Sequence, residues 1–318
     1  MNKKNVLFIS SIFHNYEKDI IKAIEFKYNV TFFSDRKYGL QFSIINNFFI
    51  SRFPEFQRAH YKNIIEQIKD KKIDILFVNR GYKMPVEFIE NFKKLFPLAK
   101  LVMYQWDSSK NNDFYYLIDH FDKSFSFDYE DCANHSKLQY LANFITIPTS
   151  LKTSPPKIDF LFVGSFEMDR YLFLKIVKSK FNLLHKQYFL KVIIPPFQLL
   201  KLFKSILKFD FEILSIKKIK NEEYILRFHD SKCIIDYSSE TQTGLSQRVV
   251  DALYYNKKII TNNASIFNEQ GVNRDLVLLL KNQNELELET FINKPDGIHH
   301  VNLLFVNSWV DKIFESIL

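Results

Sequence analysis

Short apolar runs rich in β-branched and aromatic residues alternate along this chain with longer segments in which apolar residues recur at helical spacing. The first pattern is typical of buried strands and the second of amphipathic helices, and their alternation indicates βα units around a parallel sheet. In the first half, the runs predict strands at residues 6–9, 30–33, 73–78, 101–104, 123–126 and 144–147. Helices are predicted between them, at residues 16–26, 61–69, 85–95 and 129–138.

The periodicity stops between Pro148 and Lys157, where three prolines stiffen the chain as in an interdomain linker. A helix at residues 170–179 and a second series of strands follow; the strands are predicted at residues 158–165, 190–194, 211–214, 233–236, 258–261 and 276–280. The fold class is therefore predicted to be α/β, with two Rossmann-like, doubly wound parallel-sheet domains. Their predicted bounds are 1–150 and 151–300, and a C-terminal helix within 301–318 is expected to cross back onto the first domain.

Composition and charge narrow the class of protein. The 318 residues suffice for two domains of roughly 150 each. Hydrophobic residues make up 47% and charged residues 25%, a globular balance that indicates neither a disordered chain nor a membrane bundle. The net charge of +8 fits anionic partners such as nucleotides, nucleic acid or a membrane surface. The lysines are scattered and no recognition motif is present, so nucleic acid is not the expected partner.

The cysteine spacing and the N-terminal segment are informative about the cellular location of the protein. Cys132 and Cys233 lie far apart without CxxC spacing, so neither a zinc site nor a disulfide framework is predicted. The apolar run at residues 6–10 is too short for a signal-peptide core or a membrane span. A cytoplasmic protein is expected. The basic, amphipathic segment 196–208 suggests either peripheral contact with the inner face of the cytoplasmic membrane or a helix packed on a sheet.

The clearest candidate chemistry lies in residues 237–263, which predict a strand, a polar loop, a helix and a second strand. Arg248 and Asp251 are one helical turn apart, after a loop whose backbone N–H groups are expected to be free. Helix amides and an arginine can neutralise phosphate oxygens, and a carboxylate can accept hydrogen bonds from ribose hydroxyls. The segment thus suits a nucleoside diphosphate; the alternative is a surface arginine paired with a carboxylate beside an ordinary capping loop. The loop residues assigned to the phosphates are Thr243, Gly244, Leu245 and Ser246.

A second candidate contact follows the first strand of the second domain. Gly164 and Ser165 lie at its carboxyl end, where ligands bind in open α/β sheets. They are predicted to contact the same ligand. Because no GxGxxG pattern surrounds them, a simple turn glycine is the alternative.

Two residues of the first domain are candidate general bases. Asp107 follows the strand at 101–104, and His14 lies in the loop after the first strand. Their alternatives are helix capping and a surface loop. The acidic group Asp128, Glu130 and Asp131 begins a predicted helix, where its charge favours the helix dipole, so a structural role is expected. No histidine spacing indicates a metal site.

The segment from Gln242 to Leu253, Q-T-G-L-S-Q-R-V-V-D-A-L, is followed at Asn256 by N-K-K-I-I-T-N. It resembles the Q-T-G-L-T/S-x-R-x-x-E-A-L…K-K-L-I-T-T-N segment of bacterial lipopolysaccharide and capsule biosynthesis proteins related to the CgeB-type, GT-B-fold glycosyltransferases. The match spans about 25 residues and places Asp251 where the family has glutamate. Two further segments are more loosely similar to segments of this family. They are F-V-G-S at Phe162, together with Arg170, and Y-Q-W-D-S at Tyr104, together with Asn111.

The resemblance implies a GT-B enzyme, in which two Rossmann-like lobes face a cleft, the C-terminal lobe holds the donor nucleotide and the N-terminal lobe holds the acceptor. It also implies no tightly bound metal ion or other cofactor, because basic side chains and helix amides stand at the diphosphate. The E-x7-E pattern of large retaining families is missing, so the stereochemistry stays open.

The expected function is transfer of a sugar from a nucleoside-diphosphate-sugar donor to a glycan or glycolipid acceptor of the bacterial surface, in lipopolysaccharide or capsule. Two alternatives stay open. A sugar-nucleotide epimerase of the same fold would need no acceptor glycan, and a non-catalytic protein would bind a nucleotide or glycan for an assembly complex.

Overall fold

The computed structural model describes residues 3–39, 42, 44–45, 48–148, 155–196, 198–199, 209–279 and 285–317. The chain divides into two compact units. The first comprises Met1–Thr146, Glu240–Gly244 and Leu304–Leu318, and the second comprises Ile147–Ser239 and Leu245–Leu303. Most of the predicted linker, residues 149–154, lies outside the described residues, as does most of the amphipathic segment 196–208.

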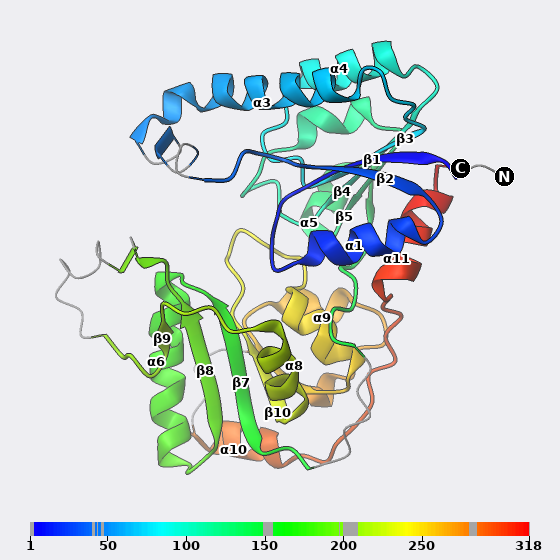
Figure 1. Ribbon diagram of the computed structural model, residues 1–318. Helices are drawn as coiled ribbons and strands as arrows, with labels where there is room; N and C mark the ends of the chain where they lie inside the picture. The colour runs from blue at the N-terminus through cyan, green and yellow to red at the C-terminus, as the bar shows by residue number, and fades with distance from the viewer. Residues whose placement is uncertain are drawn as a thin grey trace. The chain divides into compact units, whose positions relative to one another are not determined.

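The first unit is built on a six-stranded sheet in the order β2-β1-β3-β4-β5-β6, in which every pair is parallel (Figure 1). This order places β1 in the interior and requires crossover helices on both faces. The strands are β1 (Asn5–Ser10), β2 (Asn29–Ser34), β3 (Ile75–Asn79), β4 (Lys100–Gln105), β5 (Lys123–Ser126) and β6 (Leu138–Tyr140).

Helices cover both faces of this sheet (Figure 1). Alternate strand residues pack on opposite faces, so Leu7 and Ile9 join one core cluster with α3 and α4, whereas Val6 and Phe8 join another with α1 and α11. Trp309 of α11 is fully buried in the second cluster. The helices are α1 (Tyr16–Glu25), α3 (Phe53–Ile68), α4 (Val86–Leu95), α5 (Tyr129–Asn134) and α11 (Val306–Glu315), with 3-10 turns η1 (Ile50–Arg52) and η2 (Tyr115–His120).

The last predicted strand of the first half was wrong. Residues 144–147 form only an isolated bridge, between Ile145 and Phe305, and the sixth strand is β6, which begins at the last residue of the predicted helix 129–138. The helix ends early because His135 is extended, with φ −138° and ψ 107°. Leu138 then pairs with Ser124 and is buried in the sheet. The apolar residues at 144–147 are buried by packing, which periodicity alone does not separate from strand pairing.

The second unit repeats the architecture with a six-stranded parallel sheet in the order β12-β11-β10-β7-β8-β9. The strands are β7 (Ile158–Ser165), β8 (Tyr188–Ile193), β9 (Leu214–Ser215), β10 (Ser231–Asp236), β11 (Lys258–Thr261) and β12 (Val277–Leu279). The helices are α6 (Met168–Leu183), α8 (Asn221–His229), α9 (Gln247–Tyr254) and α10 (Glu285–Asn293), with 3-10 turns η3 (Ala264–Asn268) and η4 (Arg274–Leu276).

Residues of α6 and α10 share one core cluster with β7, β8 and β10, and the stacked rings of Phe160 and Phe181 lie 3.8 Å apart at its centre. In the part of the chain that the structure describes, no helix has both the length and the hydrophobicity needed to cross a bilayer.

A buried histidine, His299, is expected to make the stability of the second unit depend on pH. Nδ1 of His299 accepts a hydrogen bond from the Asn273 backbone N–H at 3.0 Å, and Nε2 lies 3.3 Å from the Lys257 carbonyl. Burial lowers the pKa of His299 below its ordinary 6.5. The unfolded state then binds the proton more readily than the folded state, so stability should fall as the pH decreases below about 6.5. Urea unfolding at pH 7.5 and pH 5.5 measures this loss.

The loss of stability between pH 7.5 and pH 5.5 should be smaller in His299→Gln. It should persist in His300→Gln, which replaces an exposed residue. Because buried His60 of the first unit also has a pKa lowered by burial, some dependence should survive in His299→Gln. An unchanged pH dependence in that variant would contradict the assignment.

Candidate functional site

The carboxyl ends of β7, β10 and β11 carry a polar cluster centred on Asp236, the last residue of β10. Asp236 is fully buried, and its two oxygens accept four hydrogen bonds. The donors are Ser246 Oγ at 2.7 Å and Arg248 Nη1 at 2.7 Å to Oδ1, and Ser238 Oγ at 2.9 Å and Thr261 Oγ1 at 3.0 Å to Oδ2. A buried carboxylate with this many donors is rigidly held, so it positions the arginine.

Arg248 lies in the first turn of α9, and the five residues that follow it, 249–253, are all buried. Its side chain is 16% exposed, and its guanidinium lies 4.8 Å from the Phe162 ring. Gly164 makes room for it, since an added Cβ would lie 2.8 Å from Arg248 Nη2. The sequence prediction named both Arg248 and Gly164; the structure brings them into contact.

A second arginine stands at the same edge. Arg170 of α6 is buried and donates to the carbonyls of Ser165 and Tyr237, at 2.7 Å and 3.0–3.1 Å, which ties the ends of β7 and β10 together. Burial, and then the charge of Arg248, lowers the pKa of Arg170. Glu167 forms an ion pair with it at 3.2 Å. Two cations are thus close together at one edge of the sheet, an arrangement that attracts anions.

The predicted free amides of the loop are occupied. The backbone N–H groups of Thr243 and Gly244 donate to Asp128 Oδ2 at 2.7 and 2.9 Å, and Thr243 Oγ1 donates to Oδ1 at 2.6 Å. Gly244 is packed against Phe127, whose carbonyl oxygen would lie 2.7 Å from an added Cβ. Its small size therefore serves packing within the first unit. The expectation of open N–H groups at these two residues was wrong because a carboxylate distant in sequence satisfies them.

The other loop residues also have partners within the protein. Leu245 is buried, and the Ser246 hydroxyl binds Asp236 rather than capping α9. Ser165 is exposed at the end of β7, where its carbonyl accepts from Arg170.

Asp251 accepts a hydrogen bond from a residue outside the Asp236 cluster. Its side chain is buried, and Oδ1 accepts a hydrogen bond from the Ile147 backbone N–H at 3.3 Å. In this conformation the carboxylate holds the chain at the start of the second unit, so the ribose contact stays a prediction without geometric support.

The expected structural role of the acidic group is confirmed, since Asp128 caps α5 by accepting from the N–H groups of Glu130 and Asp131. Its second role, as the acceptor for Thr243 and Gly244, was missed.

The first unit holds its own polar cluster where its strands end. Asp107 follows β4 and forms an ion pair with Arg80 Nη2 at 2.9 Å, with Asn111 Nδ2 at 3.4 Å. Burial raises the pKa of Asp107 although Arg80 opposes the shift. The Asp107 side chain is 23% exposed, and its role as a general base stays a prediction.

His14 is exposed in the loop after β1, with φ 51°. Its ring meets that of Phe13 edge-on at 4.3 Å, and Phe13 lies 6.5 Å from the ring of Trp106, which precedes Asp107. The two loops that carry the candidate bases therefore meet at one edge of the sheet.

Three polar residues near the ends of strands were not predicted from the sequence: Asp236, Arg36 and Arg80. Each lies where an apolar strand ends, and a polar residue at that position could have indicated a site residue. Among the described residues, no group of three His, Cys, Asp or Glu side chains is arranged to hold a metal ion.

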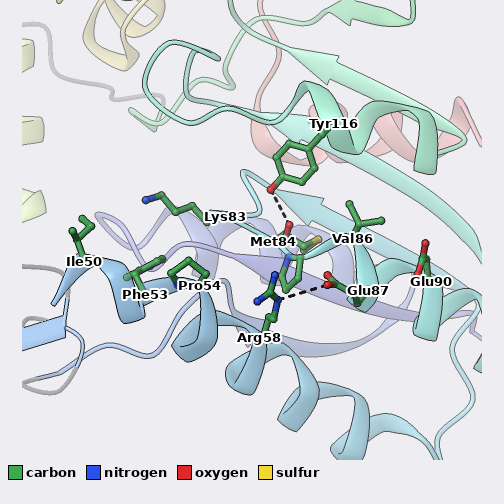
Figure 2. Close-up of a pocket in the computed structure, with 11 residues that line it drawn as sticks. Ile50, Phe53, Pro54, Arg58, Lys83, Met84, Val86, Glu87, Glu90 and Tyr116 are labelled. Carbon is green, nitrogen blue, oxygen red and sulfur yellow. Dashed lines mark hydrogen bonds and ion pairs between the residues drawn. The ribbon is translucent and has the colours of Figure 1, made fainter.

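A pocket of about 570 Å³ opens in the first unit beside the loop after β3 (Figure 2). Phe53, Met84 and Val86 form apolar walls, and the hydroxyl of Tyr116 donates to the Met84 carbonyl at 2.8 Å. Lys83 lies at the opposite end from Glu90. A volume of this size accommodates a small organic molecule or a short glycan.

Solved structures match nearly the whole chain at low sequence identity. MurG from Acinetobacter baumannii matches with a TM-score of 0.57 at 9% identity, over 98% of this chain and 99% of that chain. The glycotransferase of kitacinnamycin matches with a TM-score of 0.56 at 8% identity, over 99% and 95%. UDP-GlcNAc 2-epimerase from Neisseria meningitidis, bound to UDP-GlcNAc, matches with a TM-score of 0.56 at 10% identity, over 98% and 99%.

No protein-family model and no curated protein sequence matches this chain. The structural likeness confirms the predicted fold class: the chain has the GT-B fold, with two Rossmann-like units of parallel sheet. At these identities the likeness concerns the fold, and the activity has to be argued from the site.

Proposed function

We propose that the protein is a glycosyltransferase that moves a sugar from a nucleoside-diphosphate-sugar donor to a bacterial surface glycan of lipopolysaccharide or capsule. The observation that carries the proposal is the guanidinium of Arg248, held by buried Asp236 at the carboxyl edge of the second unit's sheet. The GT-B fold and the resemblance of residues 242–262 to surface-polysaccharide glycosyltransferases support it.

In this proposal Arg248 binds the diphosphate and stabilises the charge that develops as the sugar leaves. A planar guanidinium suits this task because it donates two parallel hydrogen bonds to phosphate oxygens. Arg170 adds positive potential from its buried position, and Gly164 leaves space for the Arg248 side chain. The reaction is proposed to need no tightly bound metal ion, which activity in excess EDTA would test.

The acceptor is proposed to bind on the first unit, where Asp107 or His14 takes the proton from the attacking hydroxyl. Asp107 is favoured because burial makes its carboxylate more basic and Arg80 fixes its orientation. His14 is the alternative because its imidazole is exposed in the loop after β1.

A sugar-nucleotide epimerase is the second candidate, because UDP-GlcNAc 2-epimerases match this chain over 98–99% of its length. An epimerase would bind the same donor at the same edge of the second unit and would release a changed nucleotide sugar.

Product analysis separates the candidates. The protein is first screened for thermal stabilisation by UDP, GDP, CMP and ADP, and the sugar nucleotides of the stabilising base are then incubated with and without a glycan extract. Release of nucleoside diphosphate that increases with the glycan supports transfer. A new nucleotide sugar without nucleotide release supports epimerisation. Binding without any product supports the non-catalytic alternative, and no binding of any nucleotide would count against the proposal.

Gly164→Ala is expected to weaken nucleotide binding by about tenfold and to lower the free energy of unfolding by about 1–3 kcal/mol, as overpacking does. The reason is steric, since the added methyl group would lie 2.8 Å from Arg248 Nη2 and 2.9 Å from the Phe162 ring. Calorimetric titration and urea unfolding measure the two effects. Ser179→Ala changes an exposed serine of α6 in the same unit and should behave like the wild type. Wild-type binding by Gly164→Ala would contradict the close packing.

A further inference from the structure

The first unit places two arginines around one tyrosine ring at the carboxyl edge of its sheet. Arg36 follows β2 and Arg80 follows β3, and their guanidinium carbons lie 4.6 and 4.9 Å from the centroid of the Tyr82 ring. The Arg36 guanidinium also lies 5.2 Å from the Tyr38 ring. We call Arg36, Arg80 and Tyr82 the arginine–tyrosine cluster. Guanidinium groups held against aromatic rings are restricted in position and can bind a planar or tetrahedral anion.

The backbone holds this cluster in place. Arg80 has φ 72° and Gly81 has φ 58°, so the chain turns sharply after β3. Gln57 of α3 donates to the carbonyls of Asp35 and Tyr82, at 2.7 and 2.6 Å, which fixes the loops after β2 and β3 against each other. A non-glycine residue in the left-handed region is uncommon and costs conformational energy, a feature that concentrates at functional sites.

Several buried polar atoms at this edge have no hydrogen-bond partner among the residues that the structure describes. They include Arg80 Nε, and also Arg36 Nε and Asp35 Oδ1, which form an ion pair with each other at 3.6 Å. At the end of β4, both polar side-chain atoms of Gln105 have no hydrogen-bond partner in the described part of the chain, although the residue is fully buried. Buried polar groups are nearly always hydrogen-bonded in proteins, so such a group of unpaired atoms indicates a bound polar ligand or ordered water.

The charges nearby are not balanced. Arg36 forms an ion pair with Asp35 and Arg80 forms one with Asp107. Lys83 lies beside the Tyr82 ring and forms no ion pair with a described residue, so these five side chains carry a net charge of +1. Ser11 accepts from Arg80 Nη1 at 3.3 Å and donates to Asp35. A single negative charge on a ligand would complete the set.

Room for the rest of such a ligand lies next to the cluster. Lys83 lines the pocket of about 570 Å³, and its ammonium lies 4.8 Å from the Phe53 ring and 5.6 Å from the Tyr82 ring (Figure 2). The other cation of the pocket, Arg58, is 3.6 Å from Glu87. Among the described residues Lys83 forms no ion pair, and it is the pocket cation that lies beside Tyr82 of the cluster.

We infer that the first unit binds an acidic acceptor, with a carboxylate or phosphate group of the glycan seated between Arg36 and Arg80 beside Tyr82. The inference rests on the proposed function and makes it more specific, because it names an anionic glycan as the acceptor class. The sugar ring carrying the acid group lies against the aromatic side chains, and its hydroxyls are presented to Asp107, the partner of Arg80.

The test compares matched monosaccharides by ligand-observed NMR titration. Glucuronic acid carries a carboxylate and glucose 6-phosphate carries a phosphate. Glucose is the neutral sugar for comparison, and inorganic phosphate is the free anion. The wild type should bind at least one of the two acidic sugars about tenfold or more tightly than glucose, since hydrogen bonds to charged groups are the stronger ones. Arg36→Gln should remove most of that preference. Arg36→Lys, which keeps a cation beside buried Asp35 and so protects the fold, should remove part of it.

Arg227→Gln removes an arginine of the second unit whose side chain is 41% exposed; it is the matched control and should retain the preference. Arg248→Ala, in the second unit, should also retain it, which excludes binding of the acidic sugars at the donor site. Equal binding of glucose and the acidic sugars, no binding of either, or a preference unaffected by Arg36→Gln would overturn the inference. Inorganic phosphate binding as tightly as glucose 6-phosphate would also overturn it, because the site would then recognise a free ion rather than a glycan. A parallel nucleotide titration reports on the donor site separately, so its failure bears on the proposed function alone.

Discussion

Arg248→Ala is expected to lower kcat/KM by at least about 100-fold, because removing one preorganised donor to a developing anion costs about 100- to 1,000-fold in rate. Arg248 Nη1 donates to Asp236 at 2.7 Å while the side chain stays 16% exposed, so a phosphate can reach the guanidinium. The rate is measured with the nucleotide sugar that stabilises the wild type. Nucleotide-dependent thermal stabilisation should decrease in parallel, since the same side chain binds the diphosphate.

Two variants separate this effect from a general loss of structure. Arg248→Lys keeps the charge without the planar fork, so its rate should lie between those of the wild type and Arg248→Ala. Arg227→Ala removes an arginine of the same unit that is 41% exposed, and its rate should be unchanged. Asp236 retains three hydroxyl donors when Arg248 is removed, so the variant should fold with a loss of about 2 kcal/mol. A folded Arg248→Ala protein with the wild-type rate would refute the donor site.

Asp128→Ala is expected to lower the free energy of unfolding by about 4 kcal/mol, the largest stability effect that we predict. The carboxylate caps α5 by accepting from Glu130 N at 3.0 Å and Asp131 N at 3.2 Å, which is worth about 1 kcal/mol. It also accepts from Thr243 N and Gly244 N, and hydrogen bonds to a charged group contribute about 1.5–3 kcal/mol each. Urea unfolding measures the change.

The matched controls for Asp128 are one conservative and one exposed substitution. Asp128→Asn keeps the shape of the side chain and loses its charge, so it should lower the free energy of unfolding by about half as much as Asp128→Ala. Asp113→Ala removes an exposed carboxylate that accepts only a local hydrogen bond, from Tyr115 N at 3.3 Å, and should cost less than about 0.5 kcal/mol. A loss below about 1 kcal/mol for Asp128→Ala would show that the segment 240–244 is held by other contacts.

The candidate site was predictable where its residues follow strands in a recognisable segment. Arg248 and Gly164 were named from the sequence, and both stand at the carboxyl edge of the second unit's sheet. Asp107 was named from its position after β4, and its partner Arg80 was not. The difference arises because a strand end is visible in the hydrophobic pattern, whereas the identity of a side chain's partner depends on which strand lies next to it.

Three expectations about single residues failed or found no support for a common reason. The N–H groups of Thr243 and Gly244 are bound by Asp128, more than a hundred positions away in the sequence, and Asp251 is buried against the backbone at Ile147. Polar groups that local patterns leave open are satisfied by distant residues when they become buried, because an unpaired buried group is costly.

Local sequence specified the alternation of strands and helices, the parallel α/β class and the places where most strands end, because hydrophobic periodicity and capping act over a few residues. Tertiary structure alone decided that residues 138–140 pair as the sixth strand, that Asp236 and Asp128 gather donors from separate segments, and that Arg36 and Arg80 lie against Tyr82. These features depend on strand order and on burial between segments distant in sequence, and neither is encoded in the pattern of any single segment.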